Sequence, residues 1–176
     1  MVFQVVVFHL LFPSPFIPYP LAQIPGSTSF IRERCLALIR KSSMHEGHWE
    51  MTVLDSLHSP IKEVILLSED EYPLISFFAG KGDWTVYTSH RLIGEVDSSR
   101  TEIKREAFDS CKWGDFKQDL DSPRVTVAHT RHLGEGRQFL YESGYASMAP
   151  IYYFIFWELK WPVWRKTYQI ENGGKA

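Results

Sequence analysis

The chain has 176 residues, of which 44% are hydrophobic and 23% charged, which is the composition of a globular domain and not of a disordered segment. Its formal net charge of −2 provides no overall attraction to nucleic acid or to an anionic membrane, so such binding would need a local basic patch. Two cysteines, Cys35 and Cys111, are too few for a disulfide framework and fit a reducing compartment, although a single bridge stays open.

The first 26 residues carry no charged side chain. Their apolar run, Met1 to Phe12, is shorter than the roughly 20 residues that a transmembrane helix needs. No Lys or Arg precedes this run, as one would in a secretory signal, and the chain that follows it is interrupted by Pro13, Pro15, Pro18 and Pro20. Three interpretations stay open: a signal or membrane-proximal segment, a genuine N-terminal arm, or a start assigned upstream of a true start at Met44 or Met51.

A helix is predicted over Phe30 to Ser42, because Ser27 to Ser29 offer N-caps. Its apolar side chains fall on one face (Ile31, Cys35, Leu36, Leu38 and Ile39). Its last turn is basic, which suits the negative end of the helix dipole.

Residues 44–59 are irregular and polar, which predicts a linker. Pro60 to Glu63 could open a short helix, or Val64 to Leu67 could form a buried strand, and periodicity does not separate the two. Ser68 to Glu71 is predicted to be a solvated acidic turn.

Seven strands are predicted next, because apolar and β-branched runs alternate with turn residues such as those at 80–83, 97–99, 121–123 and 134–136. They are Leu74–Ala79, Trp84–Ser89, Arg91–Asp97, Thr101–Phe108, Ser110–Lys117, Arg124–His129 and Gln138–Glu142. This succession predicts a mainly β fold, a small antiparallel seven-strand barrel or sandwich.

A C-terminal helix is predicted over Ile151 to Lys160, with Ser147 as its cap, Pro150 in its first turn and Trp161-Pro162 at its end. A strand would also fit this apolar run, but the cap and Pro150 favour the helix. The predicted organisation is therefore a Pro-rich segment at 1–26, a helix and linker at 27–72, a β domain with its capping helix at 73–165, and a tail at 166–176.

The hairpin that carries Thr88, Arg91, Leu92 and Ile93 after Val86-Tyr87 resembles bacterial pleckstrin-homology-like (PH/GRAM-like) domains, in which Thr-x-x-Arg-Leu-Ile follows a strand that ends in an aromatic residue. The resemblance extends over residues 74–161. It implies a seven-strand barrel with a C-terminal capping helix, and a role in binding lipid headgroups, peptides or other subunits.

Lipid-binding members of that fold gather several cations around the first strand–strand loop, and this chain departs from the pattern. The loop offers only Lys81, with Asp83 beside it, while Arg91 lies beyond the second strand. Phosphate recognition needs converging cationic donors, so a phosphoinositide site is not expected. Arg91 is expected to pair with Glu95 or Asp97.

Two His-x-x-His pairs, His45/His48 and His129/His132, have a spacing at which imidazoles can share a metal. Neither lies on a predicted helix, and His-Glu-x-His is not the metalloprotease motif. Solvated histidines are therefore the favoured interpretation, with His129 and His132 as weak candidates. Cys111 is expected to be a small buried hydrophobe.

Aromatic and basic residues alternate at the C-terminal end of the chain. Arg137 to Tyr141 fits core packing better than a base-stacking surface. Trp161, Trp164, Arg165 and Lys166 are instead expected to form a contact surface, because Trp and Arg are enriched at interface hot spots and also suit a membrane interface.

The sequence therefore predicts a non-enzymatic binding or assembly module. Its expected partners are a protein, a second copy or a membrane surface, and no nucleic acid, metal or cofactor is expected. Two alternatives stay open: a small barrel that carries a hydrophobic ligand, and a metal-dependent hydrolase. The expected location is cytoplasmic or membrane-associated, and secreted only if residues 1–26 are a true signal peptide.

Overall fold

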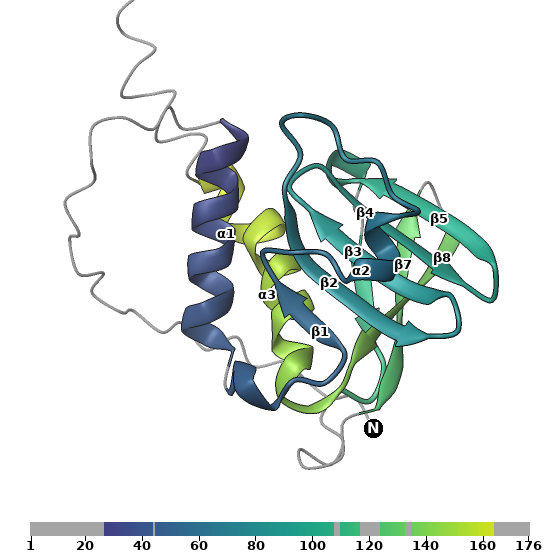
Figure 1. Ribbon diagram of the computed structural model, residues 1–176. Coiled ribbons are helices and arrows are strands. Elements are labelled where there is room, and N and C mark those ends of the chain that lie inside the picture. The colour runs from purple at the N-terminus through teal and green to yellow at the C-terminus, as the bar shows by residue number, and fades with distance from the viewer. Residues whose placement is uncertain (1–26, 44, 108–109, 117–123, 133–134, 164–176) are drawn as a thin grey trace, which may run out of the picture.

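The computed structural model describes residues 27–43, 45–107, 110–116, 124–132 and 135–163, so the predictions for residues 1–26 and for the tail lie outside it (Figure 1). Its helices are α1 (Thr28–Ser42), α2 (Ser59–Lys62) and α3 (Met148–Ile155), which continues as the π turn η4 (Phe156–Lys160). Three short 3-10 turns are η1 (Glu46–His48), η2 (Arg105–Ala107) and η3 (Gly144–Ser147). The strands are β1 (Thr52–Leu54), β2 (Pro73–Gly80), β3 (Asp83–Thr88), β4 (Arg91–Val96), β5 (Ser99–Lys104), β6 (Ser110–Trp113), β7 (Val125–His132) and β8 (Glu135–Glu142).

The strands form two antiparallel sheets, one of five strands in the order β1-β2-β3-β4-β5 and one of three in the order β6-β7-β8. The seven predicted strands are present as β2 to β8. The fourth and fifth are shorter than predicted, because η2 replaces the end of the fourth and β6 stops at Trp113, while β7 and β8 each extend toward their shared turn.

The predicted class, mainly β, is not confirmed. Helix and strand occur in roughly equal amounts among the described residues, because α1, the α3–η4 segment and several short turns are all helical. Within the described residues, no ladder joins the two sheets into a closed barrel. The coarser prediction, antiparallel sheets with an N-terminal and a C-terminal helix, is confirmed.

Tight turns connect the strands of the larger sheet. Lys81 and Gly82 join β2 to β3 with φ values of 55° and 92°, and Asp97 and Ser98 join β4 to β5 with 49° and 61°. Two consecutive left-handed residues give the turn that matches the twist of an antiparallel hairpin. These turns fix the register, so that Arg91 lies opposite Lys104 across the β4–β5 ladder.

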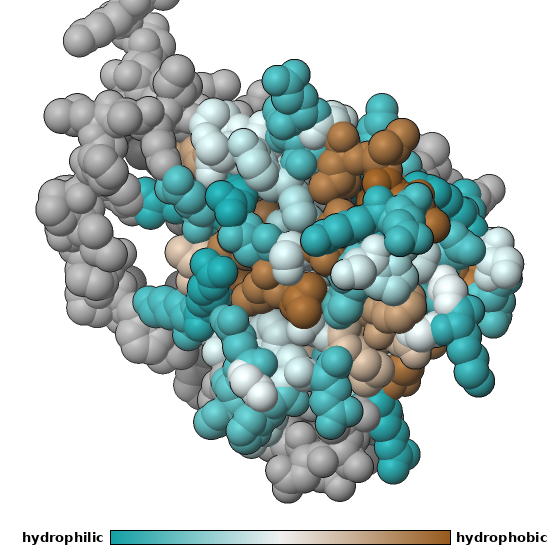
Figure 2. All heavy atoms as spheres, in the orientation of Figure 1, coloured by the Kyte–Doolittle hydropathy of each residue, from teal (hydrophilic) through white to brown (hydrophobic). Residues whose placement is uncertain are grey.

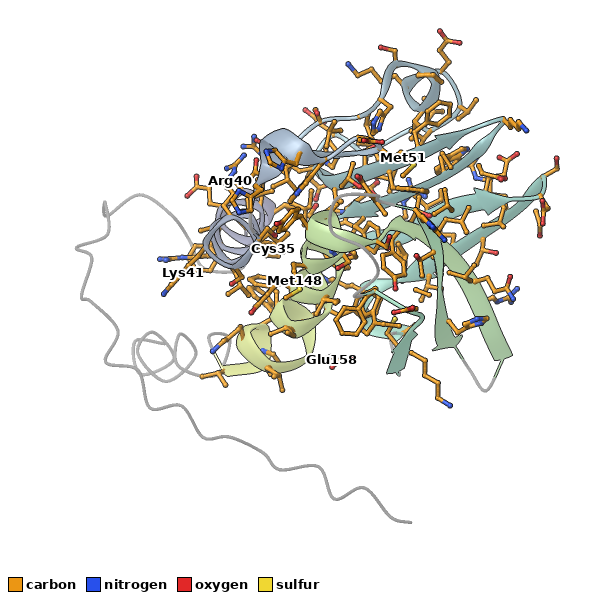
Figure 3. The ribbon with its side chains drawn as sticks, turned by 90° about the horizontal axis from the view of Figure 1, so that it is seen from below. Cys35, Arg40, Lys41, Met51, Met148 and Glu158 are labelled. Atoms are coloured by element: carbon orange, nitrogen blue, oxygen red, sulfur yellow. The ribbon has the colours of Figure 1, made fainter. Side chains whose placement is uncertain are left out.

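The main core lies between the sheets and the two long helices, with α3 between α1 and the sheets (Figure 1). Helix α1 begins where Ser27 Oγ accepts a hydrogen bond from the Phe30 N–H, as the capping residues predict. Five of its side chains are buried (Phe30, Ile31, Cys35, Leu36 and Ile39). Arg40 and Lys41 extend from α1 on the side away from the sheets (Figure 3).

A second, smaller cluster covers the other face of the large sheet. Its buried residues are Ile61, Ile65, Trp84, Val86 and Ile93, so β3 is buried on both faces. Residues 59–62 form the short helix α2, which confirms that alternative for the Pro60 segment. Brown, hydrophobic patches are visible on this face of the molecule (Figure 2), and residues 64–67 between α2 and β2 add exposed apolar side chains to the surface, with Val64 50% and Leu66 89% exposed.

The two sheets touch where β8 passes over β3 and β4. The buried Leu140 N–H donates to Thr85 Oγ1 at 3.1 Å, which links β8 to β3. Gly94 on β4 makes this approach feasible, because a Cβ atom there would lie 3.2 Å from the Phe139 ring of β8. Within its own sheet the same Cβ would lie 2.9 Å from the Trp84 carbonyl oxygen of β3.

The predicted linker over 44–59 is wrong in part, because it contains η1, β1 and the first residue of α2. Strand β1 pairs with Ile75 to Phe77 of β2. Just before it, the N–H groups of Glu50 and Met51 donate to the two carboxylate oxygens of buried Glu142, at 2.8 and 3.0 Å. A side chain 92 positions from Glu50 thus anchors this segment, which is a contact that local sequence patterns do not contain.

The predicted C-terminal helix is confirmed, but both of its ends differ from the prediction. Ser147 does not cap α3, because its hydroxyl donates back to the Gly144 carbonyl inside η3. Residues 161–163 remain helical, beyond the predicted stop. In a regular α-helix the ring of Pro162 would collide with the carbonyl four residues before it, that of Glu158. Glu158 lies in the π turn η4, which is wider than an α-helical turn.

Candidate functional site

The turn from β3 to β4 is organised by Thr88. Its Oγ1 accepts hydrogen bonds from the N–H groups of His90 (3.0 Å) and Arg91 (2.9 Å), which closes the turn. The same hydroxyl donates to the Glu71 carboxylate at 2.7 Å. The Thr-x-x-Arg pattern therefore has a local explanation: the threonine shapes the turn, and the threonine and arginine side chains meet on Glu71.

Arg91 uses all three guanidinium nitrogens. Its Nε and one terminal nitrogen bind the two oxygens of Glu71 at 2.8 and 3.1 Å. The other terminal nitrogen binds Glu102 at 2.8 Å, and the Leu66 carbonyl accepts a further bond at 2.8 Å. The predicted pairing with Glu95 or Asp97 is wrong, because β4 is extended and carries both residues away from Arg91, about 13 Å or more along the strand.

The predicted solvated turn at 68–71 is also wrong for its last residue, since the Glu71 side chain is only 1% exposed. Burial raises the pKa of Glu71, but hydrogen bonds from Arg91, Thr88 and the Ser68 N–H outweigh it and hold that pKa below its usual value. The hydrogen bond to Glu71 likewise raises the pKa of Arg91, against an opposing effect of burial. Glu71 is thus a charged, buried anchor.

A polar pocket of about 410 Å³ opens beside this ion pair. It is lined by Ser68, Glu71, His90, Arg91, Glu102, Lys104 and Arg105. Its volume falls in the range of small-ligand sites, although its lining is more polar than theirs usually is. The register of the β4–β5 hairpin brings Lys104 beside Arg91, and η2 begins with Arg105 at the end of β5.

Helix α3 supports one wall of the pocket. The buried Tyr153 hydroxyl donates to the Thr88 carbonyl at 2.9 Å, across 65 positions of sequence. The Arg105 guanidinium lies over the Trp157 ring at 5.0 Å and donates to the Ser89 carbonyl at 3.2 Å. The turn and the cation of Arg105 are therefore both held by the C-terminal helical segment.

The structure does not bring the two predicted hairpin cations together. Lys81 is exposed in the β2–β3 turn, while Arg91 lies in the turn at the other end of β3. Six residues of strand separate these ends by about 20 Å.

Of the predicted C-terminal contact surface, Trp161 lies within the described residues. It is half-buried, with its ring 5.7 Å from that of Trp157, and it packs against the main core. Trp164, Arg165 and Lys166 lie outside the described residues.

The histidine pairs form no metal centre in the described part of the chain, where no three or more His, Cys, Asp or Glu side chains gather to hold an ion. His45 and His48 do stack, with ring centroids 5.4 Å apart, and Tyr145 packs edge-on against His45. His129 is exposed on β7, and the side chain of His132 is not among those described. Burial raises the pKa of the Cys111 thiol to about 12, which makes it a poor nucleophile near neutral pH.

Comparisons with protein-family models, curated proteins and solved structures find no match to this chain. Among the described helices, none is long and apolar enough to cross a membrane.

Sequence reasoning identified Arg91 but missed Glu71, Glu102, Lys104 and Arg105. Lys104 could have been found from the sequence. A two-residue turn at 97–98 pairs Val96 with Ser99, and counting back along both strands from that pair places Lys104 opposite Arg91. Glu71 carries no such signal, since it stands in a polar run that resembles an exposed loop.

Proposed function

We propose that this chain is a non-enzymatic binding module that holds a small polar ligand, or a polar group of a partner, in the pocket beside Arg91. The observation that carries the proposal is the construction of this site. A buried ion pair, a threonine-closed turn and a tyrosine from α3 fix the wall of a pocket whose remaining side chains are mostly charged. Rigid support of this kind is what a binding site needs for selectivity.

A PH-like organisation is part of the proposal. It is supported by the order of the elements, since β2 to β5 are neighbours in one sheet, β6 to β8 form the other, and a helix follows the last strand. The pocket lies at the end of β3 opposite the Lys81 turn, so the proposed site differs from the loop that gathers cations in lipid-binding members of that fold.

The two alternative functions gain less support. A carrier of hydrophobic ligands needs an apolar cavity, whereas large side chains occupy the space between the sheets and helices, among them Tyr87, Tyr141, Tyr153, Phe139 and Phe156, each at most 1% exposed. A metal-dependent hydrolase needs side chains gathered around an ion, and within the described residues no three or more His, Cys, Asp or Glu side chains gather in this way. A hydrolase with a serine nucleophile would need a reachable hydroxyl. Ser76 Oγ lies 2.9 Å from His58 Nδ1, but Ser76 is fully buried beneath α2 and serves as an anchor for the start of that helix.

The test is a protein-detected NMR screen of the full chain with small carboxylates and phosphates, small amines and neutral sugars. We expect at least one class to shift the amide signals of residues 88–91 and 104–105 in a saturable manner, while those of Lys81 and Gly82 stay in place. Binding that maps only to other surfaces, or no binding from any class, would overturn the proposal.

A further inference from the structure

The residues that line the pocket carry more positive than negative charge. Arg91 is matched by Glu71 and Glu102, so these three groups together carry one negative charge. Lys104 and Arg105 add two positive charges, and His90 contributes a ring whose Nε2 lies 3.8 Å from Asp70. The seven lining residues therefore carry a net positive charge, and this charge lies on the side formed by the end of β5.

The acceptors of the pocket are largely occupied. Glu71 accepts four hydrogen bonds, two from Arg91, one from Thr88 and one from the Ser68 N–H. A carboxylate offers about four lone-pair sites, so Glu71 has no capacity left for the N–H groups of a ligand. Of the two carboxylates, only Glu102 could accept from an amine, and one of its oxygens already binds Arg91.

The donors of the pocket are carried by cationic side chains. Within the described residues, the Lys104 ammonium makes no hydrogen bond or ion pair, although it stands across the ladder from Arg91. Arg105 is held in place by the Trp157 ring and the Ser89 carbonyl, so its charge is fixed at the pocket wall. An ammonium with three donors beside a fixed guanidinium is the arrangement that recognises carboxylate and phosphate oxygens.

We propose that the pocket binds an oxyanion, a carboxylate or phosphate group, with Lys104 as its main donor, Arg105 as a second cation, and Arg91 as a fixed part of the scaffold. This inference rests on the proposed function and gives the ligand its chemical class. Arg91 orders the turn and the acidic residues. Lys104, which takes no part in that ion-pair network, is the residue that contacts the ligand.

The experiment is a titration of the full chain with sodium phosphate, sodium acetate and methylammonium chloride at constant ionic strength, followed by amide chemical shifts. Phosphate or acetate is expected to shift residues 88–91 and 104–105 with a dissociation constant on the order of 1 mM or above, as suits a small probe. The two anions separate phosphate from carboxylate recognition, because the one whose chemistry fits binds more tightly.

Three variants complete the test. Lys104→Ala is expected to weaken anion binding about tenfold, since it removes a charge-assisted hydrogen bond. Lys104→Arg should retain most of the affinity. Lys81→Ala is the matched control, an exposed lysine at the other end of β3, and should leave binding unchanged.

The outcomes separate the two proposals. If methylammonium, or a neutral sugar from the NMR screen of the proposed function, binds in the pocket while both anions fail, the oxyanion assignment is wrong and the binding module stands. If no probe of any class binds there, both proposals fall. If the anions bind equally well to the wild type and to Lys104→Ala, Lys104 is not the donor and the inference is overturned.

Discussion

Arg91 meets Glu71 side-on, with Nε 2.8 Å from Oε1 and a terminal nitrogen 3.1 Å from Oε2, in a place where the Glu71 side chain is 1% exposed. The pair joins two segments 20 positions apart, the turn before β2 and the start of β4. A two-point contact of this kind fixes orientation as well as distance. The rest of the candidate site is arranged around it.

Removal of the buried carboxylate should be costly. Glu71→Ala leaves the Arg91 guanidinium partly buried with only Glu102 as a charged partner, so we expect a loss of about 3 kcal/mol in the free energy of unfolding, measured by urea denaturation. Asp70→Ala is the control, because the Asp70 side chain is 70% exposed and its carboxylate lies 3.8 Å from His90. That change should cost less than about 0.5 kcal/mol. Equal effects of the two substitutions would contradict the assignment of Glu71 as an anchor.

The same pair predicts how stability depends on pH. The pKa of Glu71 is lowered in the folded protein, so between the folded and the unfolded pKa the unfolded chain binds more protons. This contribution is therefore complete above the usual carboxyl pKa of about 4.5 and is lost as the pH falls through the lower, folded value. Urea midpoints at pH 7, 5, 4 and 3 should fall more steeply for the wild type than for Glu71→Gln. Parallel curves would show that Glu71 has the same pKa in both states.

Tyr153→Phe should destabilise the protein by about 1 kcal/mol, because it removes the hydrogen bond to the Thr88 carbonyl and leaves that buried acceptor without its side-chain donor. Tyr152→Phe, on the same helix, is the matched control. The Tyr152 side chain is half-buried and makes no hydrogen bond within the described residues, so thermal unfolding of this variant should follow the wild type. A Tyr153→Phe protein as stable as its control would mean that the bond contributes nothing.

Gly94→Ala should cost about 1 to 3 kcal/mol, since the new Cβ would press against the Trp84 backbone oxygen of the neighbouring strand and against the Phe139 ring of the other sheet. Gly136→Ala on β8 has open space around the new methyl group and should be neutral or slightly stabilising. Denaturation of both variants under one set of conditions gives the comparison. If Gly136→Ala is the more damaging change, the close contacts around Gly94 do not determine which residue is tolerated there.

The elements that the sequence predicted well are those whose signals are local. Strands β2 to β4 have alternating β-branched residues and turn residues between them, and α1 has both a cap and an apolar face. Strand β1 has neither. It is three residues long, and its place depends on pairing with β2 and on the hydrogen bonds from Glu50 and Met51 to Glu142.

The candidate site was only partly predictable for a related reason. Arg91 lies in a recognisable hairpin, but its partners come from other elements: Glu71 from the turn before β2, and Glu102 from β5. Ser68 to Glu71 has the composition of an exposed turn, and the burial of Glu71 is a consequence of the fold that composition does not reveal. The expected pairing within β4 failed because neighbours along an extended strand move apart, while neighbours across the ladder stay close.

The hydrogen bond from Tyr153 to the Thr88 carbonyl makes the pocket and the C-terminal helix thermodynamically dependent on each other. A ligand that orders the Thr88–Arg91 turn is therefore expected to slow amide hydrogen exchange in α3, which it does not touch. By reciprocity, any protein that draws α3 away from the sheets should weaken ligand binding by the same factor. Because α1 packs against α3, a change in the packing of either helix would be felt at the pocket.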